Sequence, residues 1–120
     1  MTTSPHATLV QRQLDAYNAH DLDALLDTYA ADAVQYLHPG QLVADGAAAI
    51  RARMEMRFRD RLLQASLIRR VVMGDIVIDH ETVACTFPEG PGKMDAVAIY
   101  QVRDGKIQSS SVAFGEKRLD

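Results

Sequence analysis

The chain has 120 residues, 48% of them hydrophobic, and a formal net charge of −3. This length favours one domain, residues 1–120, and the negative charge argues against a nucleic-acid or anionic-membrane surface. No apolar run approaches the roughly 20 residues that a membrane span needs, and no signal peptide is visible. The single cysteine, Cys85, excludes an intramolecular disulfide, so we expect a cytoplasmic location.

Two helices are predicted near the N-terminus. Ser4 can cap the first helix, and Pro5 suits its first position. Asp21 can cap a second helix, because the apolar residues within Leu22–Tyr29 recur at helical spacing. We expect this second helix to end near residues 31–32.

A short strand and a third helix follow. Residues 33–37 are rich in β-prone side chains and predict a strand. Pro39 and Gly40 break regular pairing, so the strand delivers His38 to its end. The third helix is predicted over about residues 47–61.

The second half of the chain has a β pattern. The "PEGPG" stretch at 88–92 and "RDG" at 103–105 predict hairpin turns. The earlier break lies at 74–75 or at 79–81, and we interpret 79–81 as a solvated turn in preference to a site. Runs of helices followed by three or four antiparallel strands indicate an α+β fold, in the order α-α-β-α-β-β-β-β.

The sequence shows no phosphate-binding loop, nucleotide fingerprint, paired metal-binding histidines or serine elbow, so we expect no cofactor and no metal. Chemistry would then use isolated acids, histidines or tyrosines. His38 is the best single catalytic candidate, with a hydrogen-bonded structural role as the alternative. Cys85 lies among apolar neighbours and is interpreted as a buried, unreactive thiol.

Three stretches together carry a family resemblance: "LDAYNAHDLDALLDTYAADAV", "GAAAIRARM" and "VAIYQVRDGKI". They resemble the nuclear transport factor 2-like superfamily, and within it the SnoaL-like and ketosteroid-isomerase-like branch, over about residues 7–114. The resemblance implies a cone-shaped fold, in which three helices pack on a curved antiparallel sheet with an apolar pocket at its wide end. It also implies a homodimer formed through the outer sheet face.

The positions that act in ketosteroid isomerases hold other residues here. Gln13 stands in place of the oxyanion-donating tyrosine, and Ala98 in place of the second oxyanion-hole acid. The base position falls on Leu37 or, with a slip of one residue, on His38. A supporting tyrosine on the third helix becomes Met54. We therefore expect negligible steroid isomerisation by that mechanism.

The resemblance implies a mostly apolar pocket wall with a few hydroxyl, amide and thiol groups, which suits a weakly polar ring compound. The substrate-binding residues expected on this wall are Gln13, Tyr17, Leu37, Met54, Phe58, Cys85, Phe87, Ala98, Tyr100, Val112 and Phe114.

The sequence thus predicts a SnoaL-like protein that binds a small apolar molecule. One hypothesis is an isomerase, cyclase or hydrolase that works by acid–base chemistry, with His38 as the base. The alternatives are a non-catalytic ligand-binding module and a domain that serves dimerisation. A pocket with titratable groups favours the enzyme, a dry pocket the binding module, and a filled one the dimerisation domain.

Overall fold

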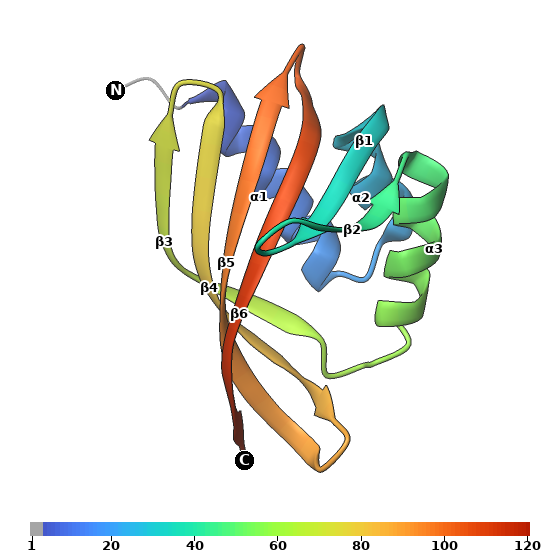
Figure 1. Cartoon of the computed structure of the whole chain (residues 1–120), viewed down its shortest axis with the longest axis vertical. Coiled ribbons are helices and arrows are strands. Elements are labelled where there is room, and N and C mark those ends of the chain that lie inside the picture. The colour runs from blue at the N-terminus through green and yellow to red at the C-terminus, as the bar shows by residue number, and fades with distance from the viewer. Residues whose placement is uncertain (1–3) are drawn as a thin grey trace.

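The structure is a computed structural model that describes residues 4–120. In this range the chain forms α1 (Pro5–Asn18), α2 (Leu22–Asp27), β1 (Tyr29–Leu37), β2 (Gln41–Asp45), α3 (Ala47–Arg57), β3 (Gln64–Met73), β4 (Ile76–Phe87), β5 (Gly90–Arg103) and β6 (Lys106–Leu119). Figure 1 shows these elements. The predicted α+β class with three helices is confirmed.

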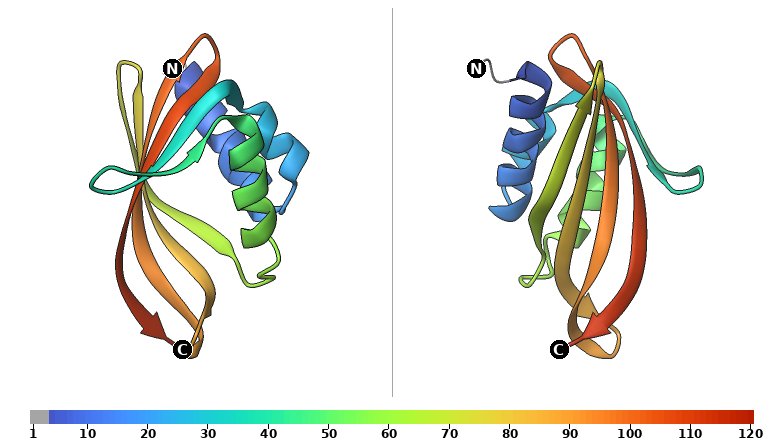
Figure 2. Two further views of the ribbon diagram at one scale, coloured as in Figure 1. Left: turned by 45° about the vertical axis from the view of Figure 1, so that its right-hand side comes forward. Right: turned by 90° about the vertical axis from the view of Figure 1, so that its left-hand side faces the viewer.

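The strands form one sheet in the order β2-β1-β6-β5-β4-β3, and the helices cover one face of it (Figure 2). Neighbouring strands are antiparallel except β1 and β6, which run parallel. The sheet is therefore mixed, and the expectation of a purely antiparallel sheet is wrong in this one pair. The two strands are far apart in the sequence, so no hairpin turn dictates their relative direction.

The second helix is shorter than predicted. It ends at Asp27, and β1 begins at Tyr29. The Thr28 hydroxyl donates to the Leu25 carbonyl oxygen at 2.7 Å, and the Ile107 amide donates to the Thr28 carbonyl oxygen at 2.9 Å. Because the chain pairs with β6 from this point, the helix ends about four residues earlier than its apolar spacing suggests.

Two further boundaries differ from the prediction. β2 was not expected, because its five residues are few and mostly exposed. The third helix ends at Arg57, not near residue 61. The Asp60 carboxylate accepts hydrogen bonds from the backbone amides of Leu62, at 3.1 Å, and Thr86, at 2.7 Å. These bonds fix a turn where a helix would otherwise continue.

The ambiguous break in the β region falls at Gly74, whose φ of 57° favours glycine. Residues 79–81 therefore lie in the middle of β4, and their interpretation as a solvated turn is wrong. The predicted turns at 88–92 and 103–105 are confirmed, because they join β4 to β5 and β5 to β6.

The core lies between the helices and the inner face of the sheet. The largest fully buried apolar side chains are Val10, Leu25, Ile50, Leu63, Val77, Val102 and Ile107. No helix within residues 4–120 is both long enough and apolar enough to cross a membrane.

A buried ion pair joins two strands to the first helix. Asp79 of β4 is fully buried, and Arg70 of β3 donates two hydrogen bonds to its carboxylate, of 2.7 and 2.8 Å. A third Arg70 nitrogen donates to Gln11 of α1 at 2.9 Å. Such a bidentate pair satisfies both charges and fixes the spacing of the strands.

Removing one member of this pair should therefore destabilise the fold strongly. We expect Asp79→Ala to lower the free energy of unfolding by about 3–5 kcal/mol, because it leaves Arg70 without its counterion. Asp95, whose side chain is 48% exposed and pairs with Arg118 at 3.2 Å, is the control, and Asp95→Ala should cost less than about 1 kcal/mol. Urea unfolding measures both, and equal losses would contradict the structural role of the buried pair.

Candidate functional site

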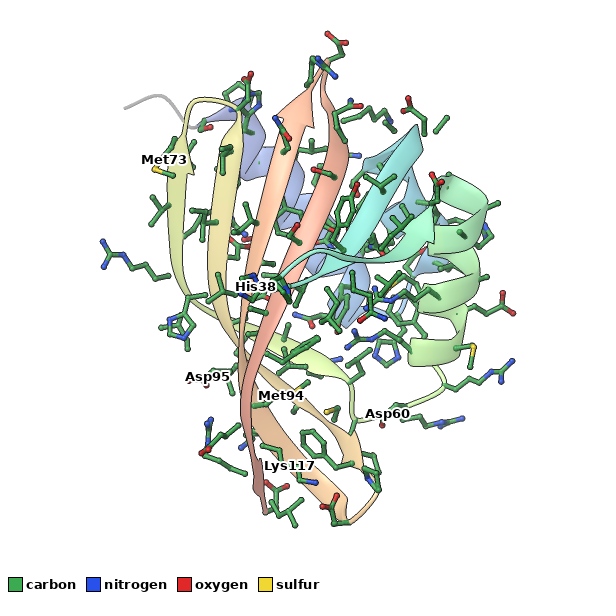
Figure 3. The ribbon with its side chains drawn as sticks, in the orientation of Figure 1. His38, Asp60, Met73, Met94, Asp95 and Lys117 are labelled. Carbon is green, nitrogen blue, oxygen red and sulfur yellow. The ribbon has the colours of Figure 1, made fainter. Side chains whose placement is uncertain are left out.

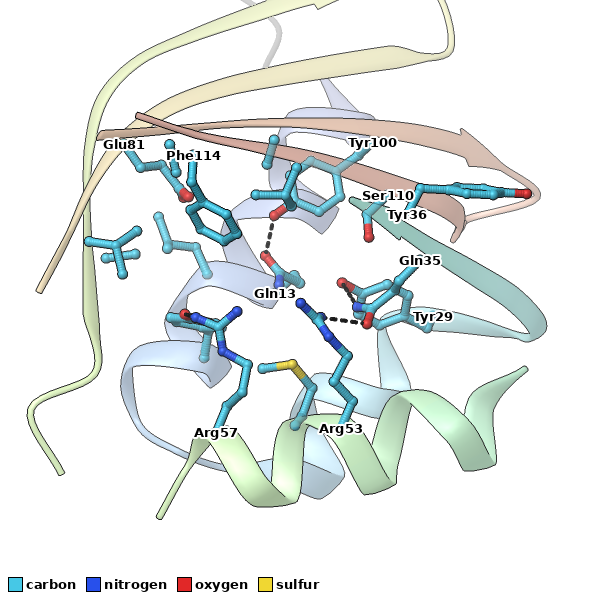
Figure 4. Close-up of a pocket in the computed structure, with 18 residues that line it drawn as sticks. Gln13, Tyr29, Gln35, Tyr36, Arg53, Arg57, Glu81, Tyr100, Ser110 and Phe114 are labelled. Atoms are coloured by element: carbon cyan, nitrogen blue, oxygen red, sulfur yellow. Dashed lines mark hydrogen bonds between the residues drawn. The ribbon is translucent and has the colours of Figure 1, made fainter. Parts of the chain in front are cut away.

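A pocket lies between α1, α3 and the inner face of the sheet (Figure 4). Its cavity volume is about 60 Å³, and the pocket is partly open to solvent, so a ligand can extend beyond the enclosed part. Seven of the expected residues line it: Gln13, Tyr17, Met54, Ala98, Tyr100, Val112 and Phe114. The structure thus brings most of the expected wall together, and the walls carry more polar groups than the sequence suggested.

Four expected residues lie outside this pocket. Phe58 stacks on the His20 ring, with 4.9 Å between the ring centroids. It therefore lies next to the C-terminal end of α1. Leu37 is the last residue of β1, next to an exposed turn. Cys85 and Phe87 lie toward the far end of β4, beyond the part of the strand that borders the pocket.

His38 is also outside the pocket, so its expected position at the pocket mouth is wrong. It is exposed and lies in the turn between β1 and β2 (Figure 3). That turn projects beyond the sheet on the side away from the helices (Figure 2). Within residues 4–120, β1 borders the pocket at Tyr29, Gln35 and Tyr36 and no further along the strand. Leu37 and His38 both lie beyond this stretch, so a slip of one residue between them does not account for the error.

Glu81 is the acidic residue that lines the pocket. It lies on the inner face of β4, in phase with the buried Val77 and Val83, and only 7% of it is exposed. Figure 4 shows its carboxyl group directed toward the pocket. No hydrogen bond or ion pair from residues 4–120 reaches this carboxyl. Burial without a hydrogen-bond partner raises the free energy of the ionised carboxylate. The pKa of Glu81 should therefore lie above its ordinary value.

The electrostatic surroundings of Glu81 raise its pKa to about 7. Loss of hydration is the main cause, and the charge of Asp79 adds to it. The charge of Arg70 opposes the shift, but the hydrogen bonds that Arg70 gives to a carboxylate both go to Asp79. The result is a carboxyl group that can take up or release a proton near neutral pH.

Tyr17 of α1 offers a second polar group. Its hydroxyl accepts a hydrogen bond from Arg57 of α3 at 3.0 Å, and burial raises its pKa to about 12. The phenol therefore stays protonated at neutral pH. Its own O–H finds no acceptor within residues 4–120, which leaves it free to donate to a ligand.

The remaining polar residues of the pocket bond to one another. Tyr100 donates to the Gln13 side-chain oxygen at 3.2 Å. Gln35 donates to the Tyr29 hydroxyl at 3.4 Å and accepts from Arg53 at 2.9 Å. These bonds hold the two amides in fixed orientations, so one wall of the pocket is a preorganised polar surface.

The sequence prediction missed several pocket residues that carry charge or hydrogen-bonding groups: Tyr29, Gln35, Arg53, Arg57, Glu81 and Ser110. A usable signal existed for one of them. Val77 and Val83 predict the buried phase of β4, and Glu81 has the same phase. Arg53 and Arg57 lie four residues apart on a helix, but their spacing alone does not distinguish a pocket from solvent.

Comparison with known proteins places this geometry in a family. The model for the SnoaL-like domain matches residues 10–110. The chain belongs to the SnoaL-like domain family. This confirms the resemblance to the SnoaL-like branch of the nuclear transport factor 2-like superfamily. Among curated proteins, no match was found for this SnoaL-like chain.

Several solved structures share the fold of this SnoaL-like domain. One is an uncharacterized cystatin-fold protein from Novosphingobium aromaticivorans, with TM-score 0.80, 23% identity and coverage of 96% of this chain and 100% of that one. Another is a "putative polyketide cyclase" from Xanthomonas campestris pv. campestris, with TM-score 0.77, 23% identity and coverage of 92% and 90%. IdmH from Streptomyces antibioticus carries the same description, with TM-score 0.78, 20% identity and coverage of 91% of each chain. At these identities the likeness establishes the fold alone.

Within residues 4–120, no three histidine, cysteine, aspartate or glutamate side chains gather closely enough to hold a metal ion.

The raised pKa of Glu81 predicts a specific pH dependence of stability. The folded protein holds this proton up to about pH 7, whereas the ordinary pKa is 4.5. The folded state thus binds more protons than the unfolded state in this interval, so the free energy of unfolding should fall as pH rises from about 4.5 to 7. The shift sets an upper limit of about 3 kcal/mol for this loss.

Glu81→Gln should remove this loss. We expect the variant to exceed the wild type in stability at pH 8, and to match it near pH 4.5, in urea unfolding. Glu55→Gln, which alters an exposed carboxyl group on α3, is the control and should follow the wild-type profile. Parallel profiles for the wild type and Glu81→Gln across this range would show that Glu81 has an ordinary pKa.

Proposed function

We propose that this SnoaL-like domain binds a small carbonyl compound in its pocket and moves a proton on it, as an isomerase, cyclase or hydrolase. Glu81 is the proton carrier, in the role that the sequence analysis gave to His38. The observation that carries the proposal is the Glu81 carboxyl group, which lines the pocket without a partner among residues 4–120 and has a pKa of about 7. A base works best when its pKa lies near the working pH.

Tyr17 complements Glu81 in this proposal. Removing a proton from the carbon next to a carbonyl group places negative charge on the carbonyl oxygen. The free O–H of Tyr17 can donate to that oxygen, and the Arg57 hydrogen bond to the same hydroxyl strengthens it as a donor. The two groups come from α1 and β4 and border the same pocket.

The reaction follows from what happens to the resulting enolate. The Glu81 carboxylate takes the proton from carbon, and the electron pair of the broken C–H bond moves into the enolate. Return of the proton at another carbon gives an isomer. Attack of the enolate carbon on a second carbonyl group of the same molecule gives a ring, with the proton delivered to the new alkoxide. The polyketide cyclase name of two similar structures agrees with the second outcome.

Proton exchange on a simple ketone tests the proposed role of Glu81. In D₂O, we expect the protein to accelerate exchange of the α-protons of 2-indanone, measured by NMR, with a rate that rises through a pH near 7. Glu81→Gln should lower the acceleration by about 100-fold or more, because general base catalysis typically supplies that factor. His38→Gln is the control and should retain the wild-type rate, because His38 lies outside the pocket.

Two outcomes would overturn this assignment. An unchanged rate in Glu81→Gln would exclude Glu81 as the base, and loss of rate in His38→Gln would restore the original candidate. Acceleration no greater than that of buffer, with 2-indanone bound in the pocket, would support the alternative function, a non-catalytic ligand-binding module.

We also propose that the chain forms one domain, works in the cytoplasm and assembles as a homodimer through the outer face of the sheet. The single cysteine is compatible with a reducing compartment. On β5, Val97 and Ile99 have the outward phase and are 37% and 43% exposed. Exposed aliphatic residues in the middle of a sheet favour burial against a second copy.

Charged substitutions on this face test the assembly. We expect the wild type to scatter light as a dimer at 100 μM, and Val97→Glu/Ile99→Glu to scatter as a monomer, because burying two carboxylates is costly. Met56→Glu, at a 66% exposed position on α3, should leave the dimer intact. A monomeric wild type at this concentration would refute the proposed interface.

A further inference from the structure

Two arginines of α3 line the pocket without an acidic partner. Arg53 and Arg57 are half-buried, and no ion pair within residues 4–120 includes either of them. Arg51 of the same helix differs, because it is paired with Asp23 at 2.7 Å. The pocket therefore contains two arginine side chains that have no ion-pair partner within residues 4–120.

Each of these arginines donates to an uncharged oxygen. Arg53 reaches the Gln35 side-chain oxygen at 2.9 Å, and Arg57 reaches the Tyr17 hydroxyl at 3.0 Å. A guanidinium group has five N–H donors, so most donors of each group remain available. Figure 4 shows both arginine side chains extending from α3 toward the pocket, with Gln35 close to Arg53.

This arrangement is costly without an anion. Half-burial strips water from both cations, and like charges four residues apart on a helix repel each other. Burial and the charge of Arg57 together lower the pKa of Arg53. A bound anion would relieve both costs, and the planar guanidinium group matches the two oxygens of a carboxylate.

The rest of the pocket identifies the kind of anion. Met54, Val112 and Phe114 supply apolar surface beside the arginines. A bare inorganic ion would leave this surface uncovered, whereas an organic acid can place its carboxylate on the arginines and its skeleton on the apolar wall.

We propose that the ligand of this pocket carries a carboxylate, which Arg53 and Arg57 bind on the side of the pocket formed by α3, opposite the sheet that bears Glu81. This inference rests on the proposed function, because it names the substrate class of the same site. The arginines then fix the orientation of the substrate and select acids over neutral analogues.

A matched pair of probes tests the inference directly. Benzoate and benzamide share shape and size and differ in charge, and protein NMR titration gives a Kd for each. We expect benzoate to bind the wild type at least about tenfold more tightly, the value of one good charge-assisted hydrogen bond. Arg53→Gln and Arg57→Gln should each reduce this preference to less than about threefold.

Arg59→Gln is the control, because Arg59 lies just beyond the end of the same helix and is exposed. It should retain the wild-type preference. The wild-type comparison decides the question even if a pocket variant fails to fold, because it needs no substitution.

The outcomes separate this inference from the proposed function. Equal binding of benzoate and benzamide by the wild type would overturn the carboxylate assignment and leave proton transfer by Glu81 standing. A preference that survives in both pocket variants would also overturn it. Inorganic phosphate that displaces benzoate at equal concentration would replace the organic acid with a general anion. Binding of neither probe would count against both proposals.

Discussion

The site depends on two carboxyl groups that face inward from one strand, with a single arginine to neutralise them. Arg70 gives two hydrogen bonds to Asp79 and so forms a closed, fully satisfied pair. Glu81, two residues along the same face of β4, receives the repulsion of Asp79 and loses most of its hydration without gaining a partner among residues 4–120. The ion pair therefore supports the fold and, at the same time, holds Glu81 in a state that favours proton exchange.

The sheet leaves room for chemistry next to these groups. Ala98 lies opposite Asp79, and Ala96 lies opposite Glu81 in the pairing of β4 with β5. Small side chains at these positions keep the space between sheet and helices open. Across this space, α3 presents Arg53 and Arg57. The pocket thus has an acid on its sheet side and cations on its helix side, which gives a polar ligand a defined orientation.

Much of the fold could be predicted from the sequence because its signals are local. Caps, helical spacing and turn residues act within a few positions, so the helices and the last two hairpins were found. The parallel pairing of β1 with β6 could not be, because it joins distant segments and no turn records it. The early end of α2 also depends on a distant segment, because the Ile107 amide of β6 donates a hydrogen bond to the Thr28 carbonyl oxygen.

The site was harder to predict because it depends on strand phase. His38 was selected for its type and its place at a strand end, but β1 borders the pocket only as far as Tyr36. Glu81 was passed over because charged residues are common in turns, although Val77 and Val83 on either side set an inward phase. Burial of a charged residue overrides its usual preference for solvent only when tertiary structure enforces it.

The pKa of Glu81 is the quantity on which this account depends most. Carbon-13 NMR of the glutamate side-chain carboxyl groups, with Glu81→Gln used to assign its signal, measures that pKa directly. We expect a titration midpoint near 7 for Glu81, because burial and the charge of Asp79 raise its pKa. A midpoint near the ordinary value of about 4.5 would show that the carboxyl group is well hydrated or paired, and would contradict its role as the proton carrier.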